Sequence, residues 1–75
     1  MRKVEFYGWD VGAKKISFTK LLRDKGNLTL KDAKNVNTRI MNGNENVVLE
    51  FEEESVAKLI VEESTNLGFK CRLID

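Results

Sequence analysis

Apolar and polar residues alternate in three short segments of the chain, at residues 3–7, 47–53 and 69–74. A period of two places the apolar side chains on one face of an extended backbone, which is typical of a strand with one buried face. In the first segment, Val4 and Phe6 form this apolar face. The sequence therefore predicts three half-buried β-strands.

Apolar residues recur at intervals of three and four positions in three further segments, which run from Lys14 to Lys25, from Thr29 to residues 42–46, and from Ser55 to Gly68. This spacing predicts amphipathic helices, each with one face toward the core. The predicted stripes are Phe18, Leu21, Leu22 and Lys25 in the first helix, Leu30, Ala33, Val36 or Asn37, and Ile40 in the second, and Val56, Leu59, Ile60, Glu63 and Leu67 in the third.

Turn-forming residues mark the ends of the predicted helices. Gly26, Gly43 and Gly68 follow the three apolar stripes, and glycine readily adopts the left-handed backbone conformation that ends many helices. Thr29 and Ser55 precede the second and third stripes, where a hydroxyl oxygen accepts a hydrogen bond from a free N–H of the first turn. We therefore expect these glycines as helix stops and these hydroxyl residues as N-caps.

The order of the predicted elements is β-α-α-β-α-β. A helix between the last two strands favours a right-handed crossover, which leaves those two strands parallel. A chain of 75 residues is long enough for one small domain, so we expect a single domain over residues 1–75. Three strands and three helices in two layers predict an α+β sandwich, in which a three-stranded sheet packs against three helices.

Charge is distributed unevenly along the chain, although the formal net charge is only +1. Residues 1–39 contain ten Lys/Arg and four Asp/Glu, whereas residues 40–75 contain three Lys/Arg and eight Asp/Glu. The first half is therefore basic and the second half acidic. Apolar runs are no longer than three residues, too short to span a bilayer, so we expect a cytoplasmic protein without a membrane partner.

The residue types that most enzyme and metal sites need are missing. The chain has no histidine and one cysteine, which excludes Cys/His metal sites, an internal disulfide and a thiol–imidazole pair. Alternation places Cys71 on the same side as Phe69 and Leu73, so we interpret it as a packed core thiol. The carboxylates of residues 50–55 precede a predicted helix, whose dipole they complement. The sequence therefore predicts a non-enzyme without a metal or cofactor, and its abundant Asn, Lys and Glu suit a small accessory protein.

Trp9 lies between Gly8 and Gly12 and has two interpretations. In the first, it is a packing residue that folds over the sheet edge or lies beneath the first helix. In the second, it is an exposed aromatic side chain on a binding loop.

Residues 14–34, KKISFTKLLRDKGNLTLKDAK, resemble the helical hairpin in the C-terminal domain of the bacterial ribosomal stalk protein. That family has a lysine, a mostly apolar stretch, a second lysine, two apolar residues and an arginine, followed by a glycine-containing turn and the pattern L-x-L-K-E-A-K. The predicted order of elements is also that of this domain and of the Clp protease adaptors, which residues 67–73 resemble as well. The matching positions in the hairpin are Lys15, Ile16, Phe18, Lys20, Arg23, Leu28, Leu30, Lys31, Asp32, Ala33 and Lys34.

In the stalk family this hairpin is a docking face for translational GTPases. The resemblance therefore implies a small protein-interaction module, whose partner protein has an acidic or mixed surface. The resemblance implies partner binding by Ile16, Phe18, Lys20, Arg23, Leu30, Asp32 and Lys34, and the cluster of cations on the two helices adds Lys15 to the predicted site.

Two alternatives are open for the same surface. One is an adaptor or inhibitor of a protein machine, like the Clp adaptors or a phage-type regulator. The other is a regulator that binds nucleic acid through the same cations. The low net charge disfavours the second alternative, because the acidic half of the chain repels phosphate.

Overall fold

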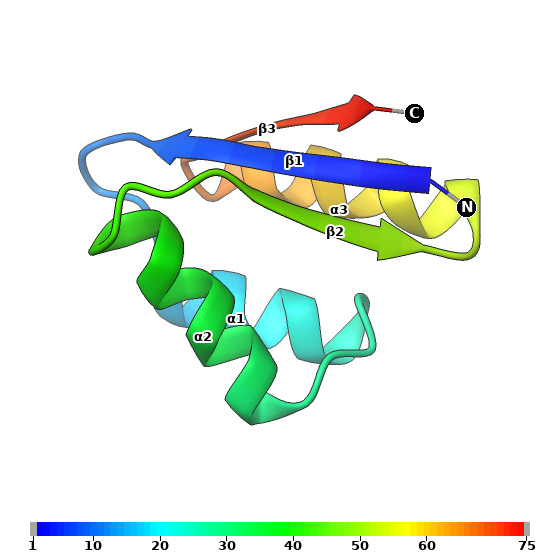
Figure 1. The fold of residues 1–75 in the computed structure, drawn as a ribbon, viewed down its shortest axis with the longest axis horizontal. Coiled ribbons are helices and arrows are strands. Elements are labelled where there is room, and N and C mark those ends of the chain that lie inside the picture. Colours follow the sequence, from blue (N-terminus) through cyan, green and yellow to red (C-terminus); the bar gives the residue numbers. More distant parts are fainter. Residues whose placement is uncertain (1, 75) are drawn as a thin grey trace.

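The computed structural model describes residues 2–74 and has the predicted α+β architecture. Three helices and a three-stranded sheet form two layers, and both ends of the described chain lie at the same end of the molecule (Figure 1). The elements are β1 (Arg2–Trp9), α1 (Lys15–Asp24), α2 (Leu30–Met41), β2 (Val47–Phe51), α3 (Glu54–Asn66) and β3 (Phe69–Ile74).

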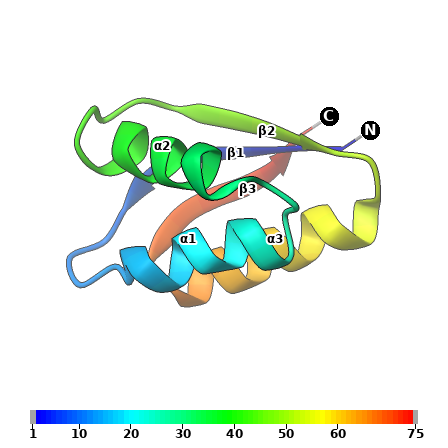
Figure 2. The ribbon, with the colours of Figure 1, turned by 90° about the horizontal axis from the view of Figure 1, so that it is seen from below.

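The first strand lies in the middle of the sheet, whose strand order is β2-β1-β3. Both neighbours run antiparallel to β1, and Phe6 lies opposite Val47 on one side and Cys71 on the other. Strands β2 and β3 therefore point in the same direction, as predicted, but β1 separates them. Figure 2 shows the helices gathered on one side of the sheet, so the inward face of β1 becomes the centre of the core.

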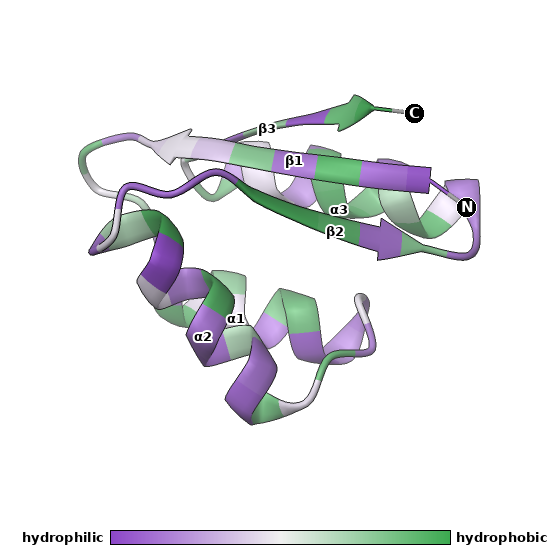
Figure 3. Ribbon diagram, in the orientation of Figure 1, coloured by the Kyte–Doolittle hydropathy of each residue, from purple (hydrophilic) through white to green (hydrophobic). Residues whose placement is uncertain are grey.

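Phe18 of α1 occupies that centre and has no exposed surface. Its ring stacks on Phe69 with 3.9 Å between the centroids and meets the edge of Phe6 at 5.4 Å. The prediction that Phe18 binds a partner is therefore wrong. The residue belongs to the stripe of α1 that faces the sheet, and burial of an aromatic ring is one of the largest single contributions to a small core. In Figure 3, α1 and α2 carry both hydrophobic and hydrophilic residues, whereas β2 is hydrophobic over most of its length.

Asparagines, rather than the neighbouring glycines, adopt the left-handed conformation after the first two helices. The φ angles are 64° at Asn27 and 51° at Asn44, so the predicted left-handed stops at Gly26 and Gly43 are wrong by one residue. Gly26 is needed for a different reason. A Cβ atom on this residue would lie 2.7 Å from the carbonyl oxygen of Leu22, which is closer than non-bonded atoms approach.

Thr29 is the N-cap of α2, as predicted, because its side-chain oxygen accepts a hydrogen bond of 3.1 Å from the N–H of Asp32. The corresponding prediction for Ser55 is wrong. Helix α3 begins at Glu54 with Glu53 as the N-cap residue, and no side chain caps it. Ser55 therefore lies inside the first turn, where its hydroxyl is too far along the helix to act as a cap.

The buried face of α3 is rotated from the predicted stripe. Its buried residues are Ala57, Ile60 and Ser64, and the hydroxyl of Ser64 has no hydrogen-bond partner among the described residues. Glu63, which the stripe included, is exposed, and so is Lys25 at the end of α1. The face of α3 that packs inward therefore combines the large side chain of Ile60 with the small side chains of Ala57 and Ser64.

A tight turn joins β1 to α1 and sets the start of that helix. The N–H of Asp10 donates to the carbonyl of Gly68 at 2.7 Å, and the N–H of Lys14 donates to the carbonyl of Leu67 at 2.9 Å. Gly68 has a φ of +95°, as expected for a left-handed helix stop.

Trp9 is the last residue of β1 rather than part of a loop, and it is partly exposed. Among the three helices, none is both long and apolar enough to cross a membrane in the part of the chain that the structure describes.

Candidate docking site

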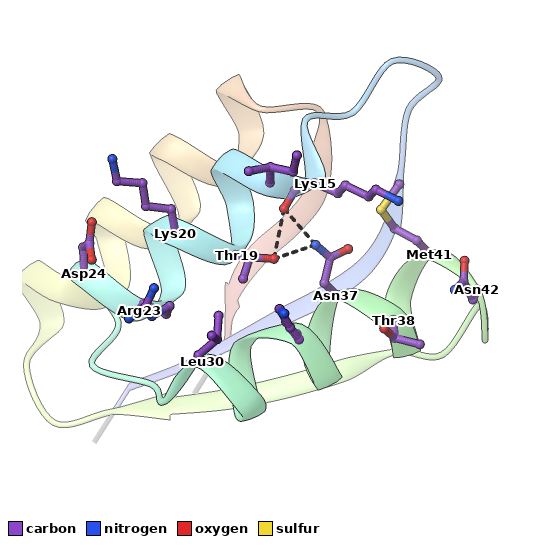
Figure 4. A pocket seen from close by; sticks show the side chains of 12 residues that line it. Lys15, Thr19, Lys20, Arg23, Asp24, Leu30, Asn37, Thr38, Met41 and Asn42 are labelled. Atoms are coloured by element: carbon purple, nitrogen blue, oxygen red, sulfur yellow. Dashed lines mark hydrogen bonds between the residues drawn. The ribbon is translucent and has the colours of Figure 1, made fainter.

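Helices α1 and α2 form a hairpin that is joined by a buried amide (Figure 4). The Nδ2 atom of Asn37 donates to the carbonyl oxygen of Lys15 at 2.8 Å and to Oγ1 of Thr19 at 2.8 Å. The hydroxyl of Thr19 in turn donates to the same carbonyl at 3.0 Å. These bonds hold the C-terminal half of α2 against the first turn of α1. The sequence pattern left Val36 and Asn37 as alternatives for the core stripe, and both are buried.

A groove of about 590 Å³ runs between the two helices on the side away from the core. Its size lies within the range of ligand-binding clefts. Every residue that lines it belongs to α1 or α2 or directly follows α2. The lining residues are Lys15, Ile16, Thr19, Lys20, Arg23, Asp24, Leu30, Lys34, Asn37, Thr38, Met41 and Asn42.

The groove contains apolar side chains that the core does not use. Ile16 is 81% exposed and Leu30 is 43% exposed, whereas Met41 packs partly against the core. Complete burial of a side chain such as Ile16 by a partner contributes about 1.5–3 kcal/mol. Burial of Ile16 and Leu30 by another molecule would therefore release desolvation energy that the fold of this protein does not use.

The cations between residues 14 and 34 have no acidic partner among the residues that the structure describes. Within residues 2–74, the other six Lys/Arg side chains all form ion pairs, at distances from 2.7 Å for Arg72 with Glu5 to 3.9 Å for Lys3 with Glu50. Residues 14–34 contain seven Lys/Arg and two Asp, a net charge of +5. The seven cations without an ion pair are Lys14, Lys15, Lys20, Arg23, Lys25, Lys31 and Lys34.

The structure brings six of the eight predicted partner-binding residues to this groove. They are Lys15, Ile16, Lys20, Arg23, Leu30 and Lys34. Asp32 is exposed in the first turn of α2 but does not line the groove, and Phe18 lies in the core. The lining residues that were not predicted for the site are Thr19, Asp24, Asn37, Thr38, Met41 and Asn42. A polar asparagine within an apolar stripe was the available signal for Asn37.

The acidic segment at the end of β2 takes part in structural ion pairs. Glu54 contacts Arg2 at 3.1 Å and Lys58 at 3.9 Å, and Glu50 contacts Lys3. A search of the described residues finds no group of three His, Cys, Asp or Glu side chains that could hold a metal ion. Glu54 therefore links α3 to β1 through Arg2, and Glu50 links β2 to β1 through Lys3.

Cys71 is partly buried and lies 3.7 Å from the hydroxyl oxygen of Thr65 and 3.5 Å from the carbonyl oxygen of Val61. Burial raises the pKa of the Cys71 thiol above its usual value, and the hydrogen bond with Thr65 only partly offsets this effect. The thiol is therefore protonated at neutral pH, which makes it a poor nucleophile.

A second hollow, of about 400 Å³, lies beside Tyr7 and Trp9. Its charged groups are already engaged, because Lys70 pairs with Asp10 at 3.8 Å and Glu45 pairs with Arg39 at 3.4 Å. The α1–α2 groove therefore differs from this hollow in combining exposed apolar side chains with cations that form no ion pair within residues 2–74. Comparison with protein-family models, curated proteins and solved structures finds no match to this chain.

Proposed function

We propose that this protein is a non-enzymatic interaction module that docks a partner protein in the α1–α2 groove. The observation that carries the proposal is the coincidence of exposed Ile16 and Leu30 with cations that form no ion pair in the described part of the chain. Apolar residues supply most of the desolvation energy of an interface, while charges guide encounter and orientation. A partner with an acidic or mixed surface satisfies both requirements, and a cytoplasmic location is part of this proposal.

The resemblance of residues 14–34 to the stalk-protein hairpin supports the same assignment. In that family the equivalent surface docks translational GTPases, and six of the implied residues line the groove in this protein. An adaptor or inhibitor of a protein machine also binds its partner through a surface of this kind. The proposal of a docking module therefore includes the adaptor and inhibitor roles.

Charge reversal in the groove tests the proposal. Lys20→Glu combined with Arg23→Glu changes the groove from basic to acidic, and we expect it to abolish recovery of the partner by affinity purification and mass spectrometry. The control is Lys25→Glu combined with Lys31→Glu, which changes the net charge equally at exposed positions outside this groove. If the groove variant recovers the same identified partner as the wild type, the proposal is wrong.

Nucleic acid is the second candidate partner, favoured by the net charge of +5 over residues 14–34. The salt dependence of the binding affinity distinguishes a nucleic-acid partner from a protein partner. A complex that neutralises several phosphates loses affinity by orders of magnitude between 50 and 200 mM salt, roughly in proportion to the number of contacts. A protein complex anchored by Ile16 and Leu30 loses much less, because apolar burial does not depend on counterions.

A further inference from the structure

We infer that the occupant of the groove is a single amphipathic α-helix of the partner, with an apolar stripe flanked on both sides by acidic residues. This inference rests on the proposed docking function and adds the shape and chemistry of the docked segment. It follows from three properties of the groove, namely its walls, its length and the placement of its charges.

The walls of the groove favour a helix over an extended segment. Both walls are helices, and no residue of β1, β2 or β3 lines the groove. An extended peptide here meets no sheet edge to which its backbone N–H and C=O groups can bond, and leaving such groups unpaired is costly. A helix satisfies its backbone internally and presents only side chains, which match the side-chain surface of α1 and α2.

The length of the groove sets the spacing of the apolar stripe. Leu30 and Met41 are the first and last residues of α2 and both line the groove, so about 16 Å separates them along the helix axis. The hydrogen bonds of Asn37 place Ile16 at the Met41 end. A docked helix of about three turns is therefore long enough to reach from Leu30 at one end of the groove to Met41 and Ile16 at the other. Its own apolar residues then occupy positions i, i+4, i+7 and i+11.

Cations on both walls set the flanking charges. Lys20 and Arg23 belong to α1 and Lys34 belongs to α2, so acidic residues on either side of the apolar stripe meet a cation. Asp24 is the one acidic residue that lines the groove. It marks the end at which the partner helix carries a cation or a neutral residue. A phosphate backbone would meet Asp24 unfavourably and would leave Ile16 without an apolar contact.

A synthetic peptide of about 18 residues tests this inference without the native partner. The peptide carries leucine at the four apolar positions and glutamate on both flanks, and a second peptide of the same composition has a scrambled order. Fluorescence anisotropy measures the binding of each peptide to the intact protein. We expect the ordered peptide to bind and the scrambled peptide to bind at least ten-fold more weakly, because scrambling removes the apolar face.

Two matched variants locate the binding site. Leu30→Ser removes an exposed apolar residue from the groove, whereas Val48→Ser removes one of similar exposure from β2. We expect Leu30→Ser and Ile16→Ser each to weaken peptide binding about ten-fold and Val48→Ser to leave it unchanged. Circular dichroism confirms that all three variants fold.

Several outcomes overturn the inference. They are equal binding of the ordered and scrambled peptides, no binding of either, or equal loss in Leu30→Ser and Val48→Ser. The proposed function is judged separately by the native partner. If the partner is lost on Lys20→Glu with Arg23→Glu while the peptide result is negative, the groove docks a protein but not by this helical mode.

Discussion

The side-chain amide of Asn37 donates to the main-chain carbonyl of Lys15 across 2.8 Å, and this bond joins the two walls of the candidate groove. The same Nδ2 atom also bonds Oγ1 of Thr19, so both of its hydrogens have partners. Asn37 is only 8% exposed. A single buried amide thus controls how α2 lies against α1 and, with it, the shape of the groove.

Asn37→Ala removes both hydrogen bonds between the helices. We expect it to lower the free energy of unfolding by about 1–3 kcal/mol, because the Lys15 carbonyl and the Thr19 hydroxyl, both in part-buried hydrogen bonds, lose the donor that Asn37 provides. Urea unfolding followed by circular dichroism measures the change. Asn35→Ala is the control, since Asn35 is exposed on the same helix and its loss changes stability by about 0.5 kcal/mol or less. Equal effects of the two substitutions would contradict the role of the Asn37 amide.

Phe18 and Ile16 lie two residues apart on α1, but substitution of Phe18 should destabilise the protein strongly and substitution of Ile16 should not. Phe18→Ala leaves a cavity beneath Phe6 and Phe69, and we expect a loss of about 3–5 kcal/mol, which is most of the stability of a domain of this size. Ile16→Ser removes only exposed surface, and we expect a change within about 0.5 kcal/mol. Thermal unfolding measures the stability that each variant loses relative to the wild type. If Ile16→Ser destabilises the protein as much as Phe18→Ala does, Ile16 belongs to the core and the prediction is wrong.

Gly26→Ala tests the helix stop between α1 and α2. The added Cβ would meet the carbonyl oxygen of Leu22 at 2.7 Å, so either the end of α1 must shift or the contact is strained. We expect a loss of about 1–3 kcal/mol in the free energy of unfolding. Asn27→Gly is the matched substitution at the neighbouring left-handed position, where glycine is accepted within about 1 kcal/mol. The prediction fails if alanine is tolerated at position 26 as well as glycine is at position 27.

Cys71 should make stability fall at alkaline pH. Burial raises the pKa of its thiol in the folded state, so the folded protein holds this proton more tightly than the unfolded chain does. The contribution is therefore complete below the ordinary thiol pKa and is lost as pH rises through the higher pKa of the folded state. Urea unfolding between pH 7 and 10 should show a smaller decline for Cys71→Ala than for the wild type. Parallel declines would show that the thiol proton is not linked to folding.

The thiol should also react slowly with iodoacetamide. Because only the thiolate attacks, and because burial raises the pKa of Cys71, alkylation of the folded protein at pH 7.5 should be slower than that of the urea-unfolded chain. Mass spectrometry of timed samples measures both rates. A folded protein that reacts faster than the unfolded chain would indicate an activated cysteine rather than a packed one.

Local sequence patterns determined the elements of this protein and much of its candidate site. Alternation around Val4 and Phe6 predicted β1, and Thr29 capped its helix as expected, because strand faces and N-caps depend on residues a few positions apart. The cations and apolar residues of the hairpin were also predicted from a continuous stretch of sequence, and six of them line one groove.

Tertiary structure decided how completely each apolar residue is buried. The predicted stripe of the first helix included Phe18 and left out Ile16, but only the packing of α1 on the sheet makes Phe18 fully buried and leaves Ile16 81% exposed. The central position of β1 depends on pairing with strands that begin only at Val47 and Phe69, which no local period encodes. The ion pairs of Arg2 and Arg72 depend on the same long-range contacts, as does the bond from Asn37 to Lys15. The docking groove is proposed from the contrast between cations that form ion pairs among the described residues and cations that do not, and this contrast therefore emerges only once the chain has folded.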